Sequence, residues 1–397
     1  MKLMRILIVL TYFYPHKSGL TVYAIRQAQA LAALGHEVTV LTSQYDSSLP
    51  REEWNQGVRI LRLPVAFHLS KGVIMPRMPL TAYRLIGESD VVNLHVPQVD
   101  AALVALLAKL RRKPVVLTYH CDLIMPTGIV NQLAGWAAGL ANRISAGLAD
   151  VIVHNTRDFA EHSSFLQKFL GKLTVIAPPI EVHPVSQEDI DRFYATYNLQ
   201  PGHPVIGMVA RMATEKGVEF LVEAMMEVLK VQPQARVIFV GEYQNVFGEE
   251  AYREKLLPMI KSLGDRWVFL GVVDEIEKAV FYQICDVLVL PSINSTESFG
   301  MVQVEALTCG TPVVATNLPG VRQPVRMSGM GEIVPVRDAE ALAEALIRVL
   351  SNDQWGDPDQ MAEIKRQYAP ETTARDYEAL FRDLVGEHGE GEGDGDE

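Results

Sequence analysis

The stretch DVLVLPSINSTESFGMVQVEALTCG, residues 286–310, decides the fold of this chain. Its first six residues, 286–291, form an apolar run of strand type, and its last residues are small and closed by glycine, as at the end of a helix. The segment therefore predicts a strand, a loop and a helix in that order. A helix that opens at about Phe299 aims the backbone N–H groups of Phe299, Gly300 and Met301 at whatever lies above the strand end. Such a helix start favours an anion, and phosphate is the natural candidate.

Two carboxylates stand eight residues apart around this helix start. Glu297 lies in the loop beside the predicted anion, and Glu305 lies on the helix roughly 8 Å further along, at ~1.5 Å per residue. A nucleotide sugar has the same layout, with a glycosyl group, a diphosphate and then a ribose whose hydroxyls need an acceptor. The alternative is that both residues are solvated glutamates of an ordinary helix.

Strand-type runs alternate with helical periods through the whole chain, which predicts parallel sheets covered by helices on both faces. At 397 residues the chain exceeds what one hydrophobic core usually serves, so two domains are expected. The pattern restarts after a proline-rich linker at about residues 180–202. The predicted strands are residues 5–10, 37–41, 58–63, 90–94, 114–118, 150–153 and 173–176, and then 205–209, 237–240, 268–270, 287–290 and 313–315.

The predicted fold is therefore α/β, with two Rossmann-like, doubly wound domains that face a central cleft. Ligands bind at the carboxyl ends of strands in such sheets, so the cleft is the expected site. We expect an N-terminal domain over 1–185, a C-terminal domain over 200–368, a helix over 369–385 that crosses back to the first domain, and an acidic, disordered tail over 386–397.

Charge is unevenly distributed along the chain. Residues 1–120 hold 14 Lys and Arg against 7 Asp and Glu, a balance of +7, whereas the whole chain carries −12, so the remainder carries −19. The basic third could face an anionic partner such as nucleic acid, a phosphorylated acceptor or a membrane surface, or its charges could be scattered and solvated. Cys121, Cys285 and Cys309 are odd in number and lack metal-type spacing. This pattern favours a reducing compartment and predicts no metal site.

No segment has the length and apolarity of a signal peptide or a membrane span. The apolar run 6–10 is too short, and the stretch 133–148 is interrupted by Asn142 and Arg143. We therefore expect a cytoplasmic protein. Residues 71–77 and 123–148 could contact the inner face of the cell membrane, or they could be a loop and a core helix.

A plain dinucleotide-binding fingerprint is absent after the first strand, where Gly19 is the glycine that could approach a ligand closely. In the second half, Arg211 and Lys216 follow the strand 205–209. A cation at a helix start is unfavourable by ~0.3–1 kcal/mol unless an anion lies beside it. Arg and Lys together suit a diphosphate, although Lys216 could instead pair with Glu215 or Glu219 on the surface.

Two histidines follow neighbouring strands of the first domain. His120 comes directly after the strand 114–118 and Tyr119, and His95 occupies the corresponding exit of the strand 90–94. A histidine at a strand exit can bind a sugar hydroxyl or relay a proton near neutral pH, and it can also be structural. His95 and Tyr119 are candidates for an acceptor pocket.

Together these motifs resemble those of the retaining glycosyltransferases of family 4, which have the GT-B architecture. The resemblance covers residues 5 to about 384, and its motifs are specific in combination. They are the Glu-x7-Glu spacing of Glu297 and Glu305 with Phe-Gly after the first glutamate, Arg211 with Lys216-Gly217, Asp-x-x-x-x-Pro-Ser at 286–292, and Gly-His-Glu-Val at 35–38.

The resemblance implies a role for each candidate residue. Glu297 would contact the donor sugar at the reacting face, and Phe299, Gly300 and Met301 would offer backbone donors to sugar and phosphate. Arg211 and Lys216 would hold the diphosphate and stabilise the departing nucleoside diphosphate. The remaining implied roles are Glu305 at the ribose, Val272 at the base, the Gly19 loop at the phosphates and His120 near the sugar.

The resemblance implies hexosyl transfer from a UDP- or GDP-sugar to a glycan or lipid-linked acceptor, with retention and without a metal or other cofactor. An anionic membrane surface is a further candidate partner, and nucleic acid is not one. Two other functions stay open, namely a nucleotide-sugar epimerase or hydrolase on the same fold and a non-catalytic nucleotide-sugar-binding protein. The chain departs from the family pattern at Gly19-Leu20, Gly241-Glu242-Tyr243 and Gln323-Pro324, which weakens the prediction of donor identity.

Overall fold

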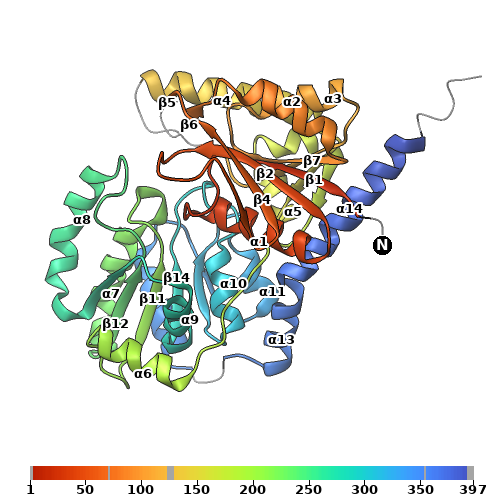
Figure 1. The fold of residues 1–397 in the computed structure, drawn as a ribbon. Coiled ribbons are helices and arrows are strands. Elements are labelled where there is room, and N and C mark those ends of the chain that lie inside the picture. The colour runs from red at the N-terminus through yellow and green to blue at the C-terminus, as the bar shows by residue number, and fades with distance from the viewer. Residues whose placement is uncertain (1–2, 70–71, 123–128, 353–354, 391–397) are drawn as a thin grey trace, which may run out of the picture. The chain divides into compact units, whose positions relative to one another are not determined.

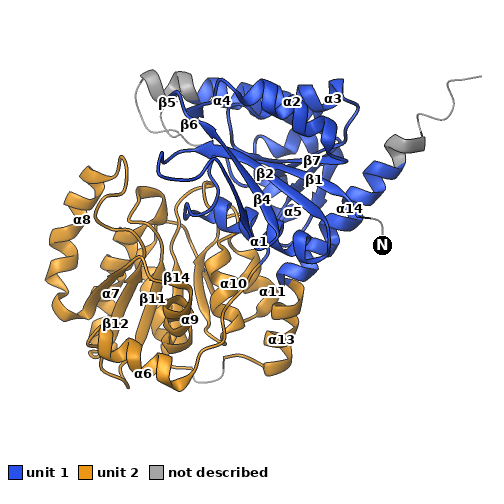
Figure 2. Ribbon diagram, viewed as in Figure 1, with its two compact units in different colours: residues 1–179, 368–397 blue, residues 180–367 orange. Residues whose placement is uncertain are grey.

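The computed structural model describes residues 3–69, 72–122, 129–352 and 355–390. It divides into two compact units (Figure 2), which are unit 1, Met1–Pro179 with Tyr368–Glu397, and unit 2, Ile180–Gln367. Each unit is built on a sheet of its own, which is fully parallel in unit 2 and parallel except at one edge strand in unit 1 (Figure 1).

Unit 1 contains an 8-stranded sheet in the order β10-β9-β8-β7-β1-β2-β4-β3. All neighbours pair in parallel except β3, which lies antiparallel to β4 at the edge, and a separate hairpin joins β5 to β6. The strands are β1 (Arg5–Val9), β2 (Glu37–Gln44), β3 (Glu52–Asn55), β4 (Val58–Pro64), β5 (Phe67–Leu69), β6 (Gly72–Ile74), β7 (Val91–Val96), β8 (Val115–Tyr119), β9 (Val151–His154) and β10 (Leu173–Val175).

The central strands of unit 1 are buried on both faces, so β7 and β8 are mostly apolar, although the polar residues Asn93, His95 and Thr118 are buried among them. The helices that cover the sheet are α1 (Gly19–Ala33), α2 (Met78–Glu88), α3 (Ala101–Leu110), α4 (Ile129–Leu148), α5 (Arg157–His162), the 3-10 helix η1 (Leu166–Lys172) and α14 (Pro370–Glu390). The last helix therefore continues past the predicted end at 385, and residues 391–397 of the predicted tail lie outside the described residues.

Unit 2 contains a 6-stranded, fully parallel sheet in the order β13-β12-β11-β14-β15-β16. Its strands are β11 (Val205–Val209), β12 (Arg236–Val240), β13 (Trp267–Gly271), β14 (Val287–Leu290), β15 (Val313–Thr316) and β16 (Gly331–Val334). Its helices are α6 (Gln187–Thr196), η2 (Thr214–Lys216), α7 (Val218–Val231), α8 (Glu250–Ser262), η3 (Gly264–Arg266), α9 (Glu275–Ile284), α10 (Met301–Thr308), α11 (Gln323–Ser328), α12 (Ala339–Leu350) and α13 (Pro358–Gln367).

The predicted fold class, two doubly wound α/β domains, is confirmed. Four strands, β3, β5, β6 and β16, were not predicted from the sequence, because they are short and either lie at a sheet edge or pair outside the main sheets. Helix α1 begins at Gly19 because Ser18 caps it, accepting from the Thr21 N–H at 3.2 Å.

Candidate active site

The strands β11 and β14 pair in parallel at the centre of the unit 2 sheet, so the loops that follow them meet at one edge. The Ile293 N–H donates to the Glu215 carbonyl at 3.0 Å and joins the two loops. The Gly217 backbone, at φ +64°, comes so close that a Cβ there would lie 2.1 Å from the Pro291 carbonyl oxygen. Only glycine fits this contact, which fixes one loop against the other.

Two of the predicted site residues touch across these loops. The Lys216 Nζ lies 2.6 Å from the Glu297 Oε2, and the two side chains are only 19% and 16% exposed. The partner of Lys216 is therefore neither Glu215 nor Glu219, the two alternatives that the sequence left open. Because the pair is largely shielded from water, its attraction is stronger than that of an exposed ion pair.

Arg211 belongs to the same loop as Lys216. Its Nη2 lies 3.1 Å from the Glu215 Oε1, and its side chain is 45% exposed. An ion pair with that exposure contributes little stability. The Arg211 guanidinium can therefore exchange this carboxylate for another anion at little energetic cost.

The helix after β14 begins at Met301, two residues later than the predicted start at about Phe299. Gly300 precedes it in the left-handed region, at φ 78° and ψ 70°, where a side chain would be strained. The Gln303 amide donates to the Phe299 carbonyl at 2.8 Å and to the Val321 carbonyl at 3.0 Å, which holds this turn in place. Because the Phe299 ring is buried, this residue can offer only its backbone to a ligand.

Glu305 lies on α10 but is almost fully buried, at 3% exposed. Its Oε2 accepts a hydrogen bond from the Tyr282 hydroxyl at 2.6 Å, and its Oε1 lies 3.6 Å from the Lys278 Nζ. Lys278 also pairs with Glu275 at 2.8 Å. The Glu305 carboxylate is thus held at a fixed orientation by two side chains of α9.

Val272 follows β13 at the same carboxyl edge of the unit 2 sheet, two strands away from β11. Its side chain is exposed. Gly271 before it has a φ of +76°, so the chain turns sharply as it leaves the strand. An exposed apolar side chain at this edge can cover a flat ring.

In unit 1, Gly19 is the first residue of α1. The Ser18 hydroxyl lies 2.9 Å from the Thr21 hydroxyl in addition to accepting from the Thr21 N–H. The loop between β1 and α1 is fixed further by the Arg62 Nη2, which donates to the Tyr14 carbonyl at 2.7 Å. Gly19 therefore stands at a capped helix start, where first-turn N–H groups lack partners within the helix.

The predicted histidines lie side by side at the carboxyl ends of β7 and β8. The His95 Nδ1 is 2.9 Å from the His120 Nε2, and the two rings stack at 5.1 Å between centroids. Burial lowers the pKa of His95 to about 3. Burial, and then the neighbouring His95, lower the pKa of His120 well below its usual value. Both rings are therefore neutral at pH 7.

Tyr119 is buried and turns toward the interior of unit 1. Its hydroxyl donates to the Asp122 Oδ1 at 2.9 Å, and its ring stacks on Phe165 at 4.8 Å between centroids. Burial, and then the nearby Asp122, raise the pKa of this hydroxyl. Ser163 donates to the same Asp122 oxygen at 2.6 Å. In the described structure Tyr119 thus positions Asp122.

Two family models match the chain. The model for group 1 glycosyl transferases matches residues 189–368, and the model for a glycosyl transferase 4-like domain matches residues 18–179. Together they cover most of both units. The chain belongs to the family 4-like glycosyltransferases. It is a GT-B glycosyltransferase that uses a nucleotide sugar.

Relatives of this glycosyltransferase include the phosphatidyl-myo-inositol mannosyltransferase of Mycobacterium leprae, 27% identical over 361 residues that cover 88% of each chain. The alpha-monoglucosyldiacylglycerol synthase of Acholeplasma laidlawii is 26% identical over 410 residues, which cover 96% of this chain and 98% of that one. Among solved structures, Anabaena Alr3699/HepE in complex with UDP has a TM-score of 0.73 at 20% identity, covering 96% of this chain and 100% of that one.

Several residues that touch the predicted site of the glycosyltransferase were missed from the sequence. Tyr282 and Lys278 hold Glu305, and Asn93 holds His95. Tyr282 and Lys278 lie within an ordinary amphipathic helix, so no spacing distinguishes them. Asn93 could have been found from the sequence. It is an amide in the middle of an otherwise mostly apolar strand, and a buried polar group needs a hydrogen-bond partner.

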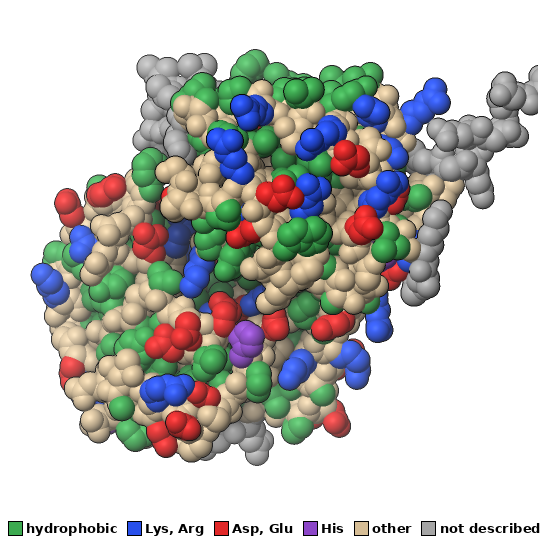
Figure 3. All heavy atoms as spheres, in the orientation of Figure 1, with side chains coloured by type: hydrophobic (Ala, Val, Ile, Leu, Met, Phe, Trp, Pro, Cys, Tyr) green, Lys and Arg blue, Asp and Glu red, His purple; other side chains and the backbone are tan. Residues whose placement is uncertain are grey.

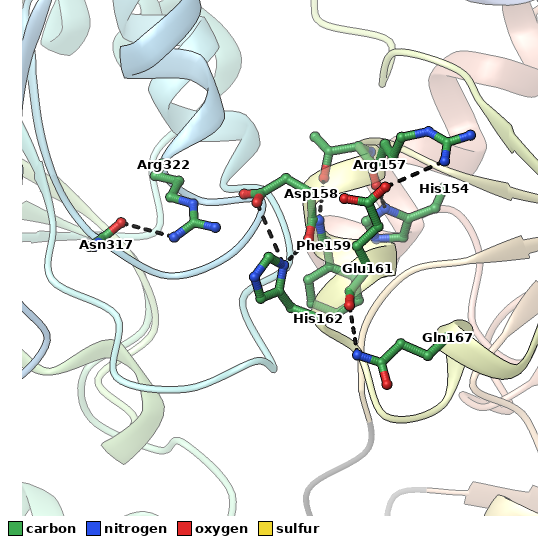
Figure 4. A network of polar contacts seen from close by, with 10 residues as sticks. His154, Arg157, Asp158, Phe159, Glu161, His162, Gln167, Asn317 and Arg322 are labelled. Atoms are coloured by element: carbon green, nitrogen blue, oxygen red, sulfur yellow. Dashed lines mark hydrogen bonds and ion pairs between the residues drawn. The ribbon is translucent and has the colours of Figure 1, made fainter. Parts of the chain in front are cut away.

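Figure 4 shows two further polar groups at strand ends, one on α5 and one in the loop after β15. On α5, the His162 Nδ1 lies 2.7 Å from the Asp158 carbonyl oxygen. In the loop after β15, the Arg322 Nη1 donates to the Asn317 Oδ1 at 3.1 Å. Each contact joins residues four or five positions apart in the chain, within one helix or loop.

Among the residues that the structure describes, no group of three or more His, Cys, Asp or Glu side chains is placed to hold a metal ion. None of the described helices is both long enough and apolar enough to cross a membrane.

Proposed function

We propose that this glycosyltransferase moves a hexose from a UDP- or GDP-sugar to a lipid-linked or glycan acceptor, with retention at the anomeric carbon. The observation that carries the proposal is the 2.6 Å contact between Lys216 and Glu297 on two joined loops. It puts one cation and one carboxylate at the carboxyl edge of the unit 2 sheet, beside the start of α10. The cation can bind a diphosphate, and the carboxylate can contact a reacting sugar.

The diphosphate binds Lys216 and Arg211, assisted by the first-turn N–H groups of α10. It displaces Glu297 from Lys216, and the freed carboxylate then contacts the donor sugar. As the bond to the sugar breaks, negative charge grows on the leaving diphosphate, and the two cations stabilise it. They supply the charge that a divalent ion would otherwise supply, so we propose that transfer requires no metal.

The other donor contacts follow from the same placement. Glu305, held by Tyr282 and Lys278, accepts from the ribose hydroxyls, and the exposed Val272 covers the base. Departure of the diphosphate and attack of the acceptor occur on the same face of the sugar, which retains the anomeric configuration. In unit 1, His120 would bind a hydroxyl of a sugar substrate, and His95 contacts His120.

For the acceptor, we propose a lipid in an anionic bilayer. Two relatives of this chain are named as a phosphatidyl-myo-inositol mannosyltransferase and an alpha-monoglucosyldiacylglycerol synthase, and each of these names contains a lipid. Large apolar side chains are exposed on α2, α3 and α4, and hydrophobic side chains with Lys and Arg beside them gather over these helices (Figure 3). The exposed side chains are Leu80, Leu106, Leu110, Trp136, Leu140 and Ile144. This mixture suits an anionic bilayer surface.

The segment 71–77 supports membrane contact less well than the sequence suggested. Val73 and Met75 are buried in the core of unit 1, and Lys71 lies outside the described residues. Of the second segment, 123–148, residues 123–128 also lie outside the described residues. The proposed surface therefore rests on the described parts of α2, α3 and α4.

The test is a donor screen with UDP-, GDP- and ADP-hexoses, with and without vesicles that contain phosphatidylinositol or diacylglycerol. We expect a UDP- or GDP-hexose to yield a glycolipid whose anomeric configuration, read by NMR, equals that of the donor. Activity should survive EDTA. Free hexose or an altered nucleotide sugar as the only product would identify the hydrolase or epimerase, and binding without any turnover would identify the non-catalytic protein.

A further inference from the structure

A chain of hydrogen bonds in the interior of unit 1 begins at Asn93, a fully buried residue in the middle of β7. The Asn93 Nδ2 donates to the Val116 carbonyl at 3.2 Å and to the Thr118 hydroxyl at 2.9 Å. A backbone carbonyl can only accept, so the orientation of the Asn93 amide is fixed. Its Oδ1 is therefore the atom that faces Gln27 and His95.

The next member of the chain is His95. Its Nε2 lies 3.2 Å from the Asn93 Oδ1, an oxygen that also accepts from the Gln27 Nε2 at 3.0 Å. Since an amide oxygen has no proton to give, the His95 Nε2 must carry one. His95 is buried and neutral at pH 7 because burial lowers its pKa to about 3. Its Nδ1 therefore holds a lone pair.

The last member is His120, whose Nε2 lies 2.9 Å from that Nδ1. Here the His95 nitrogen accepts, so the His120 Nε2 must donate. The low pKa of His120 keeps its ring neutral, and a neutral imidazole carries only one proton. The His120 Nδ1 is thus a hydrogen-bond acceptor.

The rings are also held sterically. The Tyr23 ring stands nearly perpendicular to both imidazoles, at 6.0 Å from His95 and 5.0 Å from His120 between centroids. The Tyr23 hydroxyl lies 2.9 Å from the Tyr377 hydroxyl of α14, which lies 2.9 Å from the Thr118 hydroxyl. Helix α14 therefore contributes to the same network as Asn93.

We propose that Asn93 and His95 are positioning residues that hold His120 as its Nε2–H tautomer, so that the Nδ1 accepts a hydrogen bond from a hydroxyl of a sugar substrate. This inference rests on the proposed function. An accepting nitrogen selects a hydroxyl and repels a phosphate oxygen, which also only accepts. Binding of the diphosphate is thereby left to Arg211 and Lys216, and His120 does not protonate the leaving group.

The first test needs no activity. In ¹⁵N-histidine-labelled protein at pH 7, long-range proton–nitrogen correlation spectra should show His95 and His120 as pure Nε2–H tautomers, with His120 assigned by the signals lost in His120→Gln. An Nδ1–H tautomer, a mixture of tautomers or an imidazolium at His120 would overturn the proposal. Because this readout is independent of turnover, it decides the inference even if the proposed transfer fails.

The second test compares His95→Gln with His95→Leu. The Gln side chain offers an oxygen that can accept from the His120 Nε2–H, whereas Leu cannot. We expect the Leu variant to lose roughly tenfold more kcat than the Gln variant, about 1.4 kcal/mol, with UDP binding by calorimetry equal in the two. His120 should become a tautomer mixture in the Leu variant alone. Equal kcat values in the two variants, with both folded by circular dichroism, would contradict the positioning role.

The hydroxyl could belong to the donor sugar or to the acceptor, and deoxy analogues of each distinguish them. For the substrate that carries it, removal of the hydroxyl and the His95→Leu change should be non-additive in kcat/KM. Additive effects for every analogue of both substrates would show that His120 accepts no hydrogen bond from a substrate hydroxyl. That result would overturn the inference, while glycosyl transfer itself would remain supported.

Discussion

The two units use the same architecture to present opposite kinds of chemistry. At the carboxyl edge of the unit 2 sheet, the predicted site consists of charges held in pairs, Lys216 with Glu297 and Arg211 with Glu215. At the carboxyl edge of the unit 1 sheet, it consists of two neutral histidines in a chain of hydrogen bonds. Paired charges can be exchanged for a charged ligand, whereas a fixed neutral network discriminates between donors and acceptors. Under the proposed function, anion binding would belong to unit 2 and hydroxyl recognition to unit 1.

The strongest way to break this comparison is to remove a charge from unit 2. Lys216→Ala should lower kcat by roughly 10²–10³-fold, because it removes the cation that we propose stabilises the leaving diphosphate. Glu297→Gln should lower transfer to a similar extent but tighten UDP binding, since Lys216 loses its competing partner. Initial rates and calorimetry measure both. Lys230→Ala, which removes an exposed lysine that pairs with Glu227, is the matched control, and equal losses there would refute the assignment.

The contact that joins the two loops of unit 2 can be broken without touching a charge. Gly217→Ala should destabilise the fold by ~2 kcal/mol or more, since the new Cβ would meet the Pro291 carbonyl at 2.1 Å and the φ of +64° is strained for alanine. Gly139→Ala, on α4 with no atom within 4 Å of the added Cβ, should be neutral or stabilising. Thermal unfolding measures both. A Gly217→Ala protein as stable as the wild type would show that the loops are not fixed.

Acid should act on unit 1 through its buried histidines. The pKa of His95 falls from 6.5 in the unfolded chain to about 3 in the folded protein, so below pH 6.5 the unfolded state binds the extra proton. Stability is therefore fully present above pH 6.5 and is lost as the pH falls toward 3, by up to about 1.4 kcal/mol per pH unit. Urea unfolding at pH 7, 6 and 5 should give a shallower pH dependence for His95→Gln than for the wild type. Parallel curves would contradict the neutral, buried state of His95.

The smallest expected effect concerns the outer surface of unit 1. Trp136→Ser should weaken binding to anionic vesicles about tenfold, because the 71% exposed indole would otherwise bury apolar surface in the bilayer. Trp54→Ser removes an equally exposed indole, 69%, from the edge strand β3 and serves as the control. Vesicle co-sedimentation at low salt measures both. If the two variants lost affinity equally, or neither did, the proposed surface on α2–α4 would be wrong.

Sequence reasoning located the parts of the fold that local patterns encode. The strands buried on both faces of parallel sheets appear as predominantly apolar runs, so β1, β7, β8, β11 and β14 were all predicted near their observed positions. The edge strand β3 was missed because its residues are polar or exposed and its pairing is antiparallel. Residues 52–55 form a strand because they pair with β4, and the local sequence does not show this pairing.

For the site, the sequence placed Lys216, Arg211 and Glu297 on loops that follow strands, and the structure brings Lys216 and Glu297 into contact. As the alternative to a diphosphate, the sequence offered Glu215 or Glu219 as the partner of Lys216, because those residues are near in sequence and Glu297 is not. The acceptor-side role of Tyr119 stays a prediction, and the structure shows this residue buried, with its hydroxyl donating to Asp122.

The sequence by itself determined the order of the main buried strands, the doubly wound class of both units and the residue types at the strand exits, because periodicity and helix-end chemistry act over a few neighbouring residues. Only the tertiary structure decided which of these residues touch. Lys216 meets Glu297, Tyr282 meets Glu305, and Asn93 sets the protonation of His95, because parallel strands bring together side chains that are distant in the chain or separated by a crossover helix. The charge state and hydrogen-bonding role of each site residue are properties of these contacts.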